Sequence, residues 1–245
     1  MDKSLYSEMA SLETRHWWFL GRRIIIFDVI KRFCGSPSGK ALDVGLGTGI
    51  NGEFLSKAGY LVDGVEDSDE AMRFVEKNYP SLSVLKTSFP SSSISSESYK
   101  LVTALDVIEH MEDDVSALKA AYRALVQGGH VVVTTPAFSF LWTKHDELAH
   151  HKRRYRKKEL KRKLEEAGFE TIFISYFNFF LFPAIATFRF FGKVTSTKKG
   201  TSDFSRTPDF LNLPFTKLFS SERFLMRYFS LPFGVSIIAV GKKPI

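Results

Sequence analysis

The feature that most constrains the fold is a glycine-rich loop directly after a short apolar run. Residues 41–52 read ALDVGLGTGING, so an apolar strand with one acid, Asp43, leads into Gly45, Gly47 and Gly49. Glycine lets the backbone turn tightly and approach a ligand without a Cβ in the way. A helix that opens after such a loop offers free N–H groups to a polar or anionic ligand group. The segment therefore predicts a strand–loop–helix unit that binds a nucleotide-like ligand.

A second acid supports this interpretation. The next apolar run ends in Glu66, at about the spacing where βαβ folds place an acid on ribose hydroxyls. Residues 47–52 also match the dinucleotide pattern GxGxxG. Two features argue against a dehydrogenase, because Asp43 would lie close to a pyrophosphate and the chain shows one nucleotide-binding half. A ligand with a sulfonium charge and an adenosine suits Asp43 and Glu66 better.

Short apolar runs alternate with segments of helical period, which predicts βαβ units and a mostly parallel sheet. Strands are expected at Lys40–Val44, Tyr60–Val65, Ser83–Leu85, Lys100–Leu105, His130–Thr135, Thr171–Ser175 and Val235–Val240. Helices are expected at Asn51–Ala58, Ser68–Asn78, Asp114–Gln127 and Lys157–Ala167, with one or two more within 5–34. Gly128-Gly129 is expected just past a helix end.

We expect one α/β domain over 1–245. Its parts are N-terminal helices in 1–38, a Rossmann-like core in 39–176 and 233–245, and a Phe-rich helical cap inserted at 177–232, with a loop near 195–203.

The positive charge is concentrated in one segment. The chain has a net charge of +7, and residues 150–163 (HHKRRYRKKELKRK) hold nine cations and one anion. The near-neutral remainder argues against a protein that wraps nucleic acid. Three roles for the segment stay open, in this order: a solvated helix face, contact with phosphate on a substrate or anionic lipid, and contact with RNA. A nucleic-acid partner is therefore not expected.

The compartment is indicated by composition and by the N-terminus. The single cysteine, Cys34, fits a reducing compartment. The first residues lack the apolar core of a signal peptide. The longest apolar stretch, 172–191, is interrupted by polar residues and a proline, so it is a poor membrane span. We expect a cytoplasmic protein, with peripheral contact to a membrane as an open alternative.

These motifs together resemble class I S-adenosylmethionine-dependent methyltransferases, of the type 11/12 kind that includes ubiquinone-pathway O-methyltransferases. The resemblance is carried by ALDVGLGTG, VDGVEDSDEA, LVTALDVIEHMEDD and LKAAYRALVQGGHVVVTTP, about residues 40–136, and by HWWFLGRR near the N-terminus. It implies a Rossmann-like seven-stranded sheet and S-adenosylmethionine as the methyl donor.

The resemblance also implies which residues hold this cofactor. Ser88 and Phe89 stand where the family often has an acid that holds the adenine. The implied set is Arg23 (with Arg22 as the alternative) for the methionyl carboxylate, Gly45, Gly47 and Gly49 for the methionyl part, Asp43 for the positive charge, Glu66 for the ribose, Asp67, Ser88 and Phe89 for the adenine, and Leu105 for the adenine or sulfonium.

Two histidines are candidates for activating a methyl acceptor. His110 follows the fourth strand at the edge where open α/β sheets bind ligands, and it either acts as a base or caps its turn. His145 precedes Asp146, which could orient an imidazole. A metal site could be drawn from Asp146 and the histidines of 145–151, but their spacing fits no helical ligand pair, so no metal is expected.

We expect methyl transfer to a small-molecule or lipid-linked acceptor, with oxygen as the favoured atom. The alternatives are a non-catalytic S-adenosylmethionine-binding protein and an RNA methyltransferase. The insertion is expected to roof an apolar acceptor pocket and to rest on a membrane, or, nearly as readily, to form a homodimer interface. The basis is a group of phenylalanines too numerous for one face of a short helix: Phe179, Phe180, Phe182, Phe188, Phe190 and Phe191.

Overall fold

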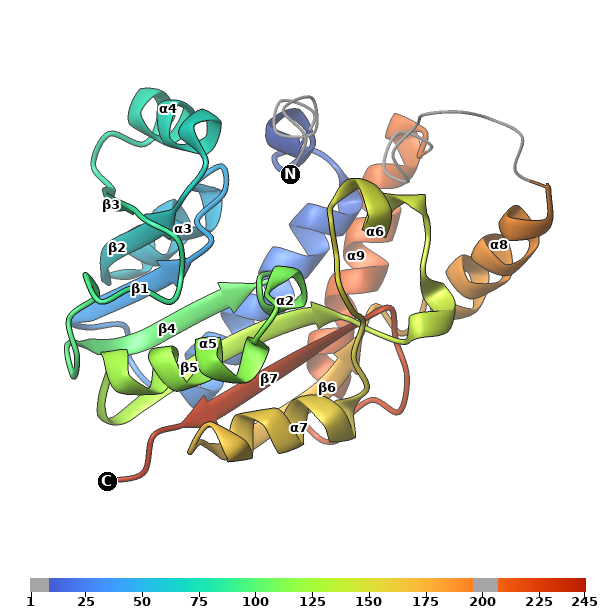
Figure 1. Cartoon of the computed structure of the whole chain (residues 1–245). Helices are drawn as coiled ribbons and strands as arrows, with labels where there is room; N and C mark the ends of the chain where they lie inside the picture. Colours follow the sequence, from blue (N-terminus) through green and yellow to red (C-terminus); the bar gives the residue numbers. More distant parts are fainter. Residues whose placement is uncertain (1–8, 196–206) are drawn as a thin grey trace.

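The computed structural model describes residues 9–195 and 207–245, which form a seven-stranded sheet with helices on both faces (Figure 1). The strands are β1 (Lys40–Val44), β2 (Leu61–Glu66), β3 (Ser83–Lys86), β4 (Tyr99–Leu105), β5 (Leu125–Pro136), β6 (Glu170–Phe177) and β7 (Ser236–Lys242). Their order is β3-β2-β1-β4-β5-β7-β6. β7 runs antiparallel to both of its neighbours, whereas the pairs from β3 to β5 are parallel. This confirms the predicted Rossmann-like sheet and differs from the six-stranded parallel order of dinucleotide folds.

The helices cover the two faces of the sheet. They are α2 (Trp17–Phe33), α3 (Ile50–Ala58), α4 (Asp69–Asn78), α5 (Asp114–Ala124), α6 (Lys144–Leu148), α7 (Lys157–Glu166), α8 (Phe182–Thr195) and α9 (Asp209–Leu225), with 3₁₀ turns η1 (Ile108–His110) and η2 (Ser139–Leu141). In the view of Figure 1, α5 and α7 lie in front of the sheet, and α2 and α9 lie behind it. Residues 9–12 are also helical. No helix in the described ranges is long and apolar enough to cross a membrane.

The predicted helix Asp114–Gln127 is three residues too long, and the prediction that Gly128-Gly129 follows a helix end is wrong. The helix ends at Ala124, and Leu125 already pairs with Tyr99 in the sheet. The register then shifts, so that the next pair is Leu101 with His130. Gly128 has a φ of 74°, and a Cβ on Gly129 would lie 2.9 Å from the Val126 carbonyl oxygen. The two glycines therefore allow an irregularity inside β5, as glycines in strands often do.

The insertion between β6 and β7 is helical, as predicted, but α9 does more than cover a pocket. α9 packs along α2 on the back face of the sheet. Phe219 of α9 lies so close to Gly21 of α2 that a Cβ there would sit 2.6 Å from its ring, and its ring centroid is 5.9 Å from that of Trp17. The predicted loop near 195–203 and the side chains of Phe188, Phe190 and Phe191 lie outside the described residues, apart from the backbone of Thr195.

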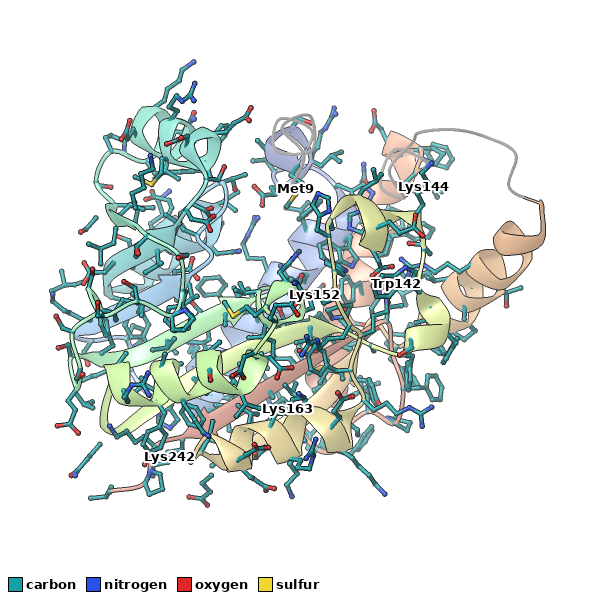
Figure 2. The ribbon with its side chains drawn as sticks, viewed as in Figure 1. Met9, Trp142, Lys144, Lys152, Lys163 and Lys242 are labelled. Atoms are coloured by element: carbon teal, nitrogen blue, oxygen red, sulfur yellow. The ribbon has the colours of Figure 1, made fainter. Side chains whose placement is uncertain are left out.

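Part of the basic segment forms a group of buried ion pairs, called the clamp below, through Arg153, Arg154 and Lys163. The Tyr155 hydroxyl donates to Asp114 over 2.7 Å, and Lys163 and Arg153 pair with the same carboxylate at 2.8 and 3.1 Å. Arg154 is buried and pairs with Asp146 at 2.8 Å. Figure 2 labels Lys163, which lies on α7 beside α5. These contacts attach the chain after β5 to the start of α5. The other cations of the segment are mostly exposed, as expected for a solvated face: Lys152, Arg156, Lys158, Lys161 and Arg162.

Asp114→Asn should destabilise the protein by about 3 kcal/mol, because a buried group of cations and a hydroxyl would lose its shared anion. Burial alone would raise the pKa of Asp114, but hydrogen bonds from Lys163 and Tyr155 outweigh it and lower the pKa. The carboxylate therefore stabilises the fold above its unfolded-state pKa near 4, and this contribution is lost as the pH falls. Denaturant unfolding at several pH values measures the difference. Asp113→Ala, which removes the exposed helix cap next to it, is the matched control and should cost less. Equal losses in the two variants would contradict the clamp.

Candidate active site

A cavity of about 1060 Å³ lies at the carboxyl ends of the parallel strands. Its wall includes residues from the loops after β1, β2, β3, β4 and β5, from α2 and from the insertion. Met9, on the helical segment 9–12, lies above these strand ends in Figure 2 and also contributes to the wall. The volume matches that of a small-molecule or cofactor site.

The glycine loop forms part of this wall through two of its three predicted glycines. Gly45 and Gly47 have φ values of 66° and 59° and line the cavity. A Cβ on Gly45 would lie 2.8 Å from Val107, whereas a Cβ on Gly47 would meet no neighbour closer than the Gly45 carbonyl oxygen at 3.9 Å. The space in front of Gly47 is therefore open to a ligand. Gly49 caps the N-terminus of α3 and is not part of the wall.

Glu66 joins the end of β2 to the glycine loop. One carboxylate oxygen accepts the Gly47 N–H over 2.8 Å, and the other accepts the N–H groups of Asp67 and Ser68 over 3.1 and 3.0 Å. Burial raises the pKa of Glu66, and hydrogen bonds from the Ser68 and Gly47 amides oppose that rise. A carboxylate has roughly four acceptor positions, so one is left for a ligand hydroxyl. The Glu66 carboxylate is thus held in place by the loop and can still accept a hydrogen bond from a ligand.

Asp43 lies behind the glycine loop and is not part of the cavity wall. It is buried, and the Thr103 hydroxyl of β4 donates to it over 2.5 Å. Burial raises the pKa of Asp43 to about 7, although the hydrogen bond from Thr103 lowers it. Any effect of Asp43 on a cationic ligand therefore acts through space rather than by contact.

The two arginines of α2 have different surroundings. Arg22 lines the cavity, and its guanidinium contacts Asp106 and Thr134, each at 2.7 Å. Arg23, the first choice from sequence, is not among the residues that line the cavity; it donates to the Glu13 carbonyl oxygen over 3.1 Å and lies over the ring of Phe54. The Nε atoms of both arginines are buried with no hydrogen-bond partner among the described residues.

The remaining predicted cofactor residues all line the cavity. These are Asp67, Ser88, Phe89 and Leu105. The chain after β3, which carries Ser88 and Phe89, is tied to the end of β2 by the hydrogen bond from the Thr87 N–H to the Glu66 carbonyl oxygen at 3.1 Å. Leu105 is the last residue of β4, on the other side of β1.

Both predicted histidines line the cavity, together with His151, one of several that the sequence argument considered, and His16, which precedes α2. The rings of His110 and His151 lie 4.7 Å apart between centroids, and those of His145 and His151 lie 6.1 Å apart. Burial and the neighbouring His151 lower the pKa of His110 to about 4, so that this ring is neutral at pH 7. Glu109, which sequence reasoning did not single out, is fully buried on the same wall.

Comparison with known proteins identifies the family. A model of a methyltransferase domain matches residues 18–173. The ubiquinone biosynthesis O-methyltransferase of Hydrogenovibrio crunogenus is 30% identical over 117 residues, which are 44% of this chain and 47% of that protein. A "Probable S-adenosylmethionine-dependent methyltransferase" of Mycolicibacterium smegmatis is 25% identical over 164 residues, 66% of this chain and 63% of that protein. This chain thus spans about half of the first relative and less than two thirds of the second.

The fold is shared with solved structures. A Haloferax volcanii methyltransferase, solved in complex with the Trm112 methyltransferase activator, superposes with a TM-score of 0.65 at 16% identity, over 99% of this chain and 95% of that one. The chain belongs to the class I S-adenosylmethionine-dependent methyltransferase family.

S-adenosylmethionine is the cosubstrate of this family, and the residues present fit it. The open space at Gly47, the spare acceptor position of Glu66 and the Arg22 guanidinium on the cavity wall are complementary to an amino-acid backbone, a ribose hydroxyl and a carboxylate.

Arg22→Met should weaken binding of S-adenosylhomocysteine by about tenfold or more, because a hydrogen bond to a charged group contributes roughly 1.5–3 kcal/mol. Arg23→Met is the matched control, since Arg23 is equally buried but off the cavity wall, and it should have a smaller effect. Isothermal calorimetry measures both affinities. A larger loss of affinity in Arg23→Met than in Arg22→Met would indicate that Arg23, and not Arg22, binds the methionyl carboxylate.

Proposed function

We propose that the protein transfers a methyl group from S-adenosylmethionine to a hydroxyl of a small-molecule or lipid-linked acceptor. The observation that carries the proposal is the continuity of one cavity from the glycine loop, past His110, His145 and His151, to apolar residues of the insertion. A donor bound at the loop and an acceptor bound under the insertion would then meet beside the histidines. Holding two reactants in line supplies much of the rate enhancement of such a displacement.

In this proposal the cofactor is held by residues from five places along the chain. Arg22 binds the methionyl carboxylate, and Gly45 and Gly47 let the backbone approach the methionyl part. Glu66 accepts from the ribose, and Asp67, Ser88 and Phe89 surround the adenine. Leu105, at the end of β4, lies toward the sulfonium. The bound cofactor supplies an electrophilic methyl group on a positively charged sulfur.

The acceptor side of the proposal rests on the histidines. The acceptor oxygen forms a bond to the methyl carbon while the carbon–sulfur bond breaks and leaves its electron pair on sulfur. The acceptor proton has to leave, and a neutral imidazole is able to accept it. His110 is neutral at pH 7, and His145 is the second candidate on the same wall.

Other functions receive less support. An RNA methyltransferase would need a wide cationic surface, but several cations of the basic segment are paired with Asp114, Asp146 and Glu112. A non-catalytic cofactor-binding protein would have no need for a cavity that extends beyond the cofactor loop to the insertion.

Methyl transfer should be detected as S-adenosylhomocysteine release with an alkyl-substituted phenol, and the product should be its methyl ether. The matched acceptor is the corresponding aniline, which offers nitrogen at the same position and should react more slowly. Mass spectrometry of both products makes the distinction. Methylation of the aniline in preference to the phenol would contradict the oxygen assignment, and cofactor binding with neither product would favour the non-catalytic alternative.

We further propose that α9 rests on an anionic membrane surface that presents the acceptor. Phe210, Leu213, Phe224 and Tyr228 are exposed along and just after α9, with exposed fractions of 76, 63, 48 and 83%. Exposed apolar side chains at this density indicate an interaction surface. Cationic Lys217 and Arg227 are exposed on the same element and just beyond it, and each cation near an anionic bilayer contributes about 1 kcal/mol.

The Phe210→Ser, Leu213→Ser double variant should lose most of its flotation with phosphatidylglycerol vesicles. Leu61→Ser is the control, because Leu61 is 68% exposed on β2, far from α9 in the fold. Size-exclusion chromatography of the same proteins tests the other use of this face. If the wild type is a dimer that does not bind vesicles, and the double variant is a monomer, the exposed face of α9 is a dimer interface and not a membrane-binding surface.

A further inference from the structure

Three side chains on the acceptor side of the cavity form a cluster that the methyl-transfer chemistry above does not fully use. The possible metal-ligand atoms of Glu109, His110 and His151, one from each side chain, all lie within 4.8 Å of one another. Glu109 and His110 belong to η1, directly after β4, and His151 belongs to the loop after α6. All three line the cavity. Two imidazoles and one carboxylate are a common ligand set for a divalent transition metal with an open coordination position.

Glu109 is the strongest sign of a missing partner. Its side chain is completely buried, and neither carboxylate oxygen has a hydrogen-bond partner among the residues that the structure describes. The nearby cations are already paired, Arg22 with Asp106 and Arg154 with Asp146. A buried carboxylate without partners is costly, and such groups in native proteins usually have a water or an ion that satisfies them.

His151 is oriented as metal-binding histidines are. Its Nδ1 lies 2.8 Å from an Asp146 carboxylate oxygen. Burial would raise the pKa of Asp146, but hydrogen bonds from His151 and Arg154 outweigh it and hold the carboxylate ionised. An ionised carboxylate can only accept, so the proton is on Nδ1 and the lone pair is on Nε2. A carboxylate behind a ligating imidazole is the usual outer-shell arrangement of zinc sites.

The backbone fixes the two halves of the cluster relative to each other. The Lys152 N–H donates to the Glu109 carbonyl oxygen over 2.9 Å, which joins the residue after His151 to the residue before His110. The Tyr155 hydroxyl donates to the Ile108 carbonyl oxygen over 3.3 Å. Ligand atoms about 2.1 Å from one ion are roughly 3–4 Å from one another. Side-chain rotations that move the ligand atoms by about an ångström would therefore complete the site.

We propose that Glu109, His110 and His151 bind one divalent transition-metal ion, of the zinc or iron(II) class, with a coordination position open to the cavity. The binding itself does not depend on the proposed function. The role of the ion does rest on it: an acceptor hydroxyl at the open position would be oriented and made more acidic, as metal-bound water is. His110 would then be a ligand rather than a base.

The test is a titration of the tag-free, full-length protein with Co²⁺, followed by its visible d–d absorption, and competition with Zn²⁺. The wild type should bind one ion per chain. Glu109→Gln and His151→Gln should each weaken Co²⁺ binding at least tenfold. His150→Asn is the matched control, because His150 is an exposed neighbour of His151 with a φ of 57° that asparagine tolerates. This control should bind as the wild type does.

Calorimetry with S-adenosylhomocysteine keeps the test independent of folding and of the proposed function. His151→Gln should bind it with wild-type affinity, because His151 contacts Asp146, His110 and His145 rather than the glycine loop. The fold of Glu109→Gln is checked by circular dichroism, because the charge of Glu109 also acts on Arg22. A wild-type protein that binds neither ion, or site variants that bind Co²⁺ as tightly as His150→Asn, would overturn the metal site. Ion binding without methylation of any acceptor would leave the site standing and remove its role in the proposed function.

Discussion

The hydrogen bond between the Gly47 N–H and the Glu66 carboxylate is the contact on which the cofactor half of the site depends. It connects two loops that parallel pairing of β1 and β2 places side by side, with Val44 opposite Val65. Backbone hydrogen bonds from Gly45 and Leu46 to the Val65 carbonyl oxygen also hold the loop to β2. Without the Glu66 contact, the Gly47 N–H would lose its acceptor, and the Glu66 carboxylate would lose one of the three amides that hold it. The open wall at Gly47 and the acid beside it are therefore one unit, set by the register of two strands.

The acceptor half depends on a different constraint. The chain after β5 makes a long excursion through η2 and α6, and buried ion pairs return it to the start of α5. Asp146 has two parts in this, since it pairs with Arg154 and orients His151. The Asp146 carboxylate thus both stabilises the fold and positions one member of the cluster formed by Glu109, His110 and His151. Three cations of the basic segment, Arg153, Arg154 and Lys163, thus neutralise acids that the clamp buries.

The sequence was sufficient for features set by local spacing and insufficient for those set by tertiary contacts. Gly47 and Glu66 could be predicted because a strand, a turn and a helix fix their separation. Arg22 and Arg23 could not be separated, because neighbouring helix residues point about 100° apart and only the packing of α2 decides which one faces the cavity. His151 was one of several adjacent histidines, and its pairing with His110, distant in sequence, exists only through the clamp. The glycines of β5 look like a helix end in sequence because both situations require an unusual backbone.

The central claim is that the glycine loop and Glu66 form the cofactor site, and calorimetric titration with S-adenosylhomocysteine tests it most directly. Glu66→Ala should weaken binding by about 1–3 kcal/mol, since ligand hydroxyls and three backbone amides lose their acceptor. Gly47→Val, which fills the open wall, should weaken it at least as much. Wild-type affinity in both variants, with folding intact by circular dichroism, would place the cofactor elsewhere and contradict the account.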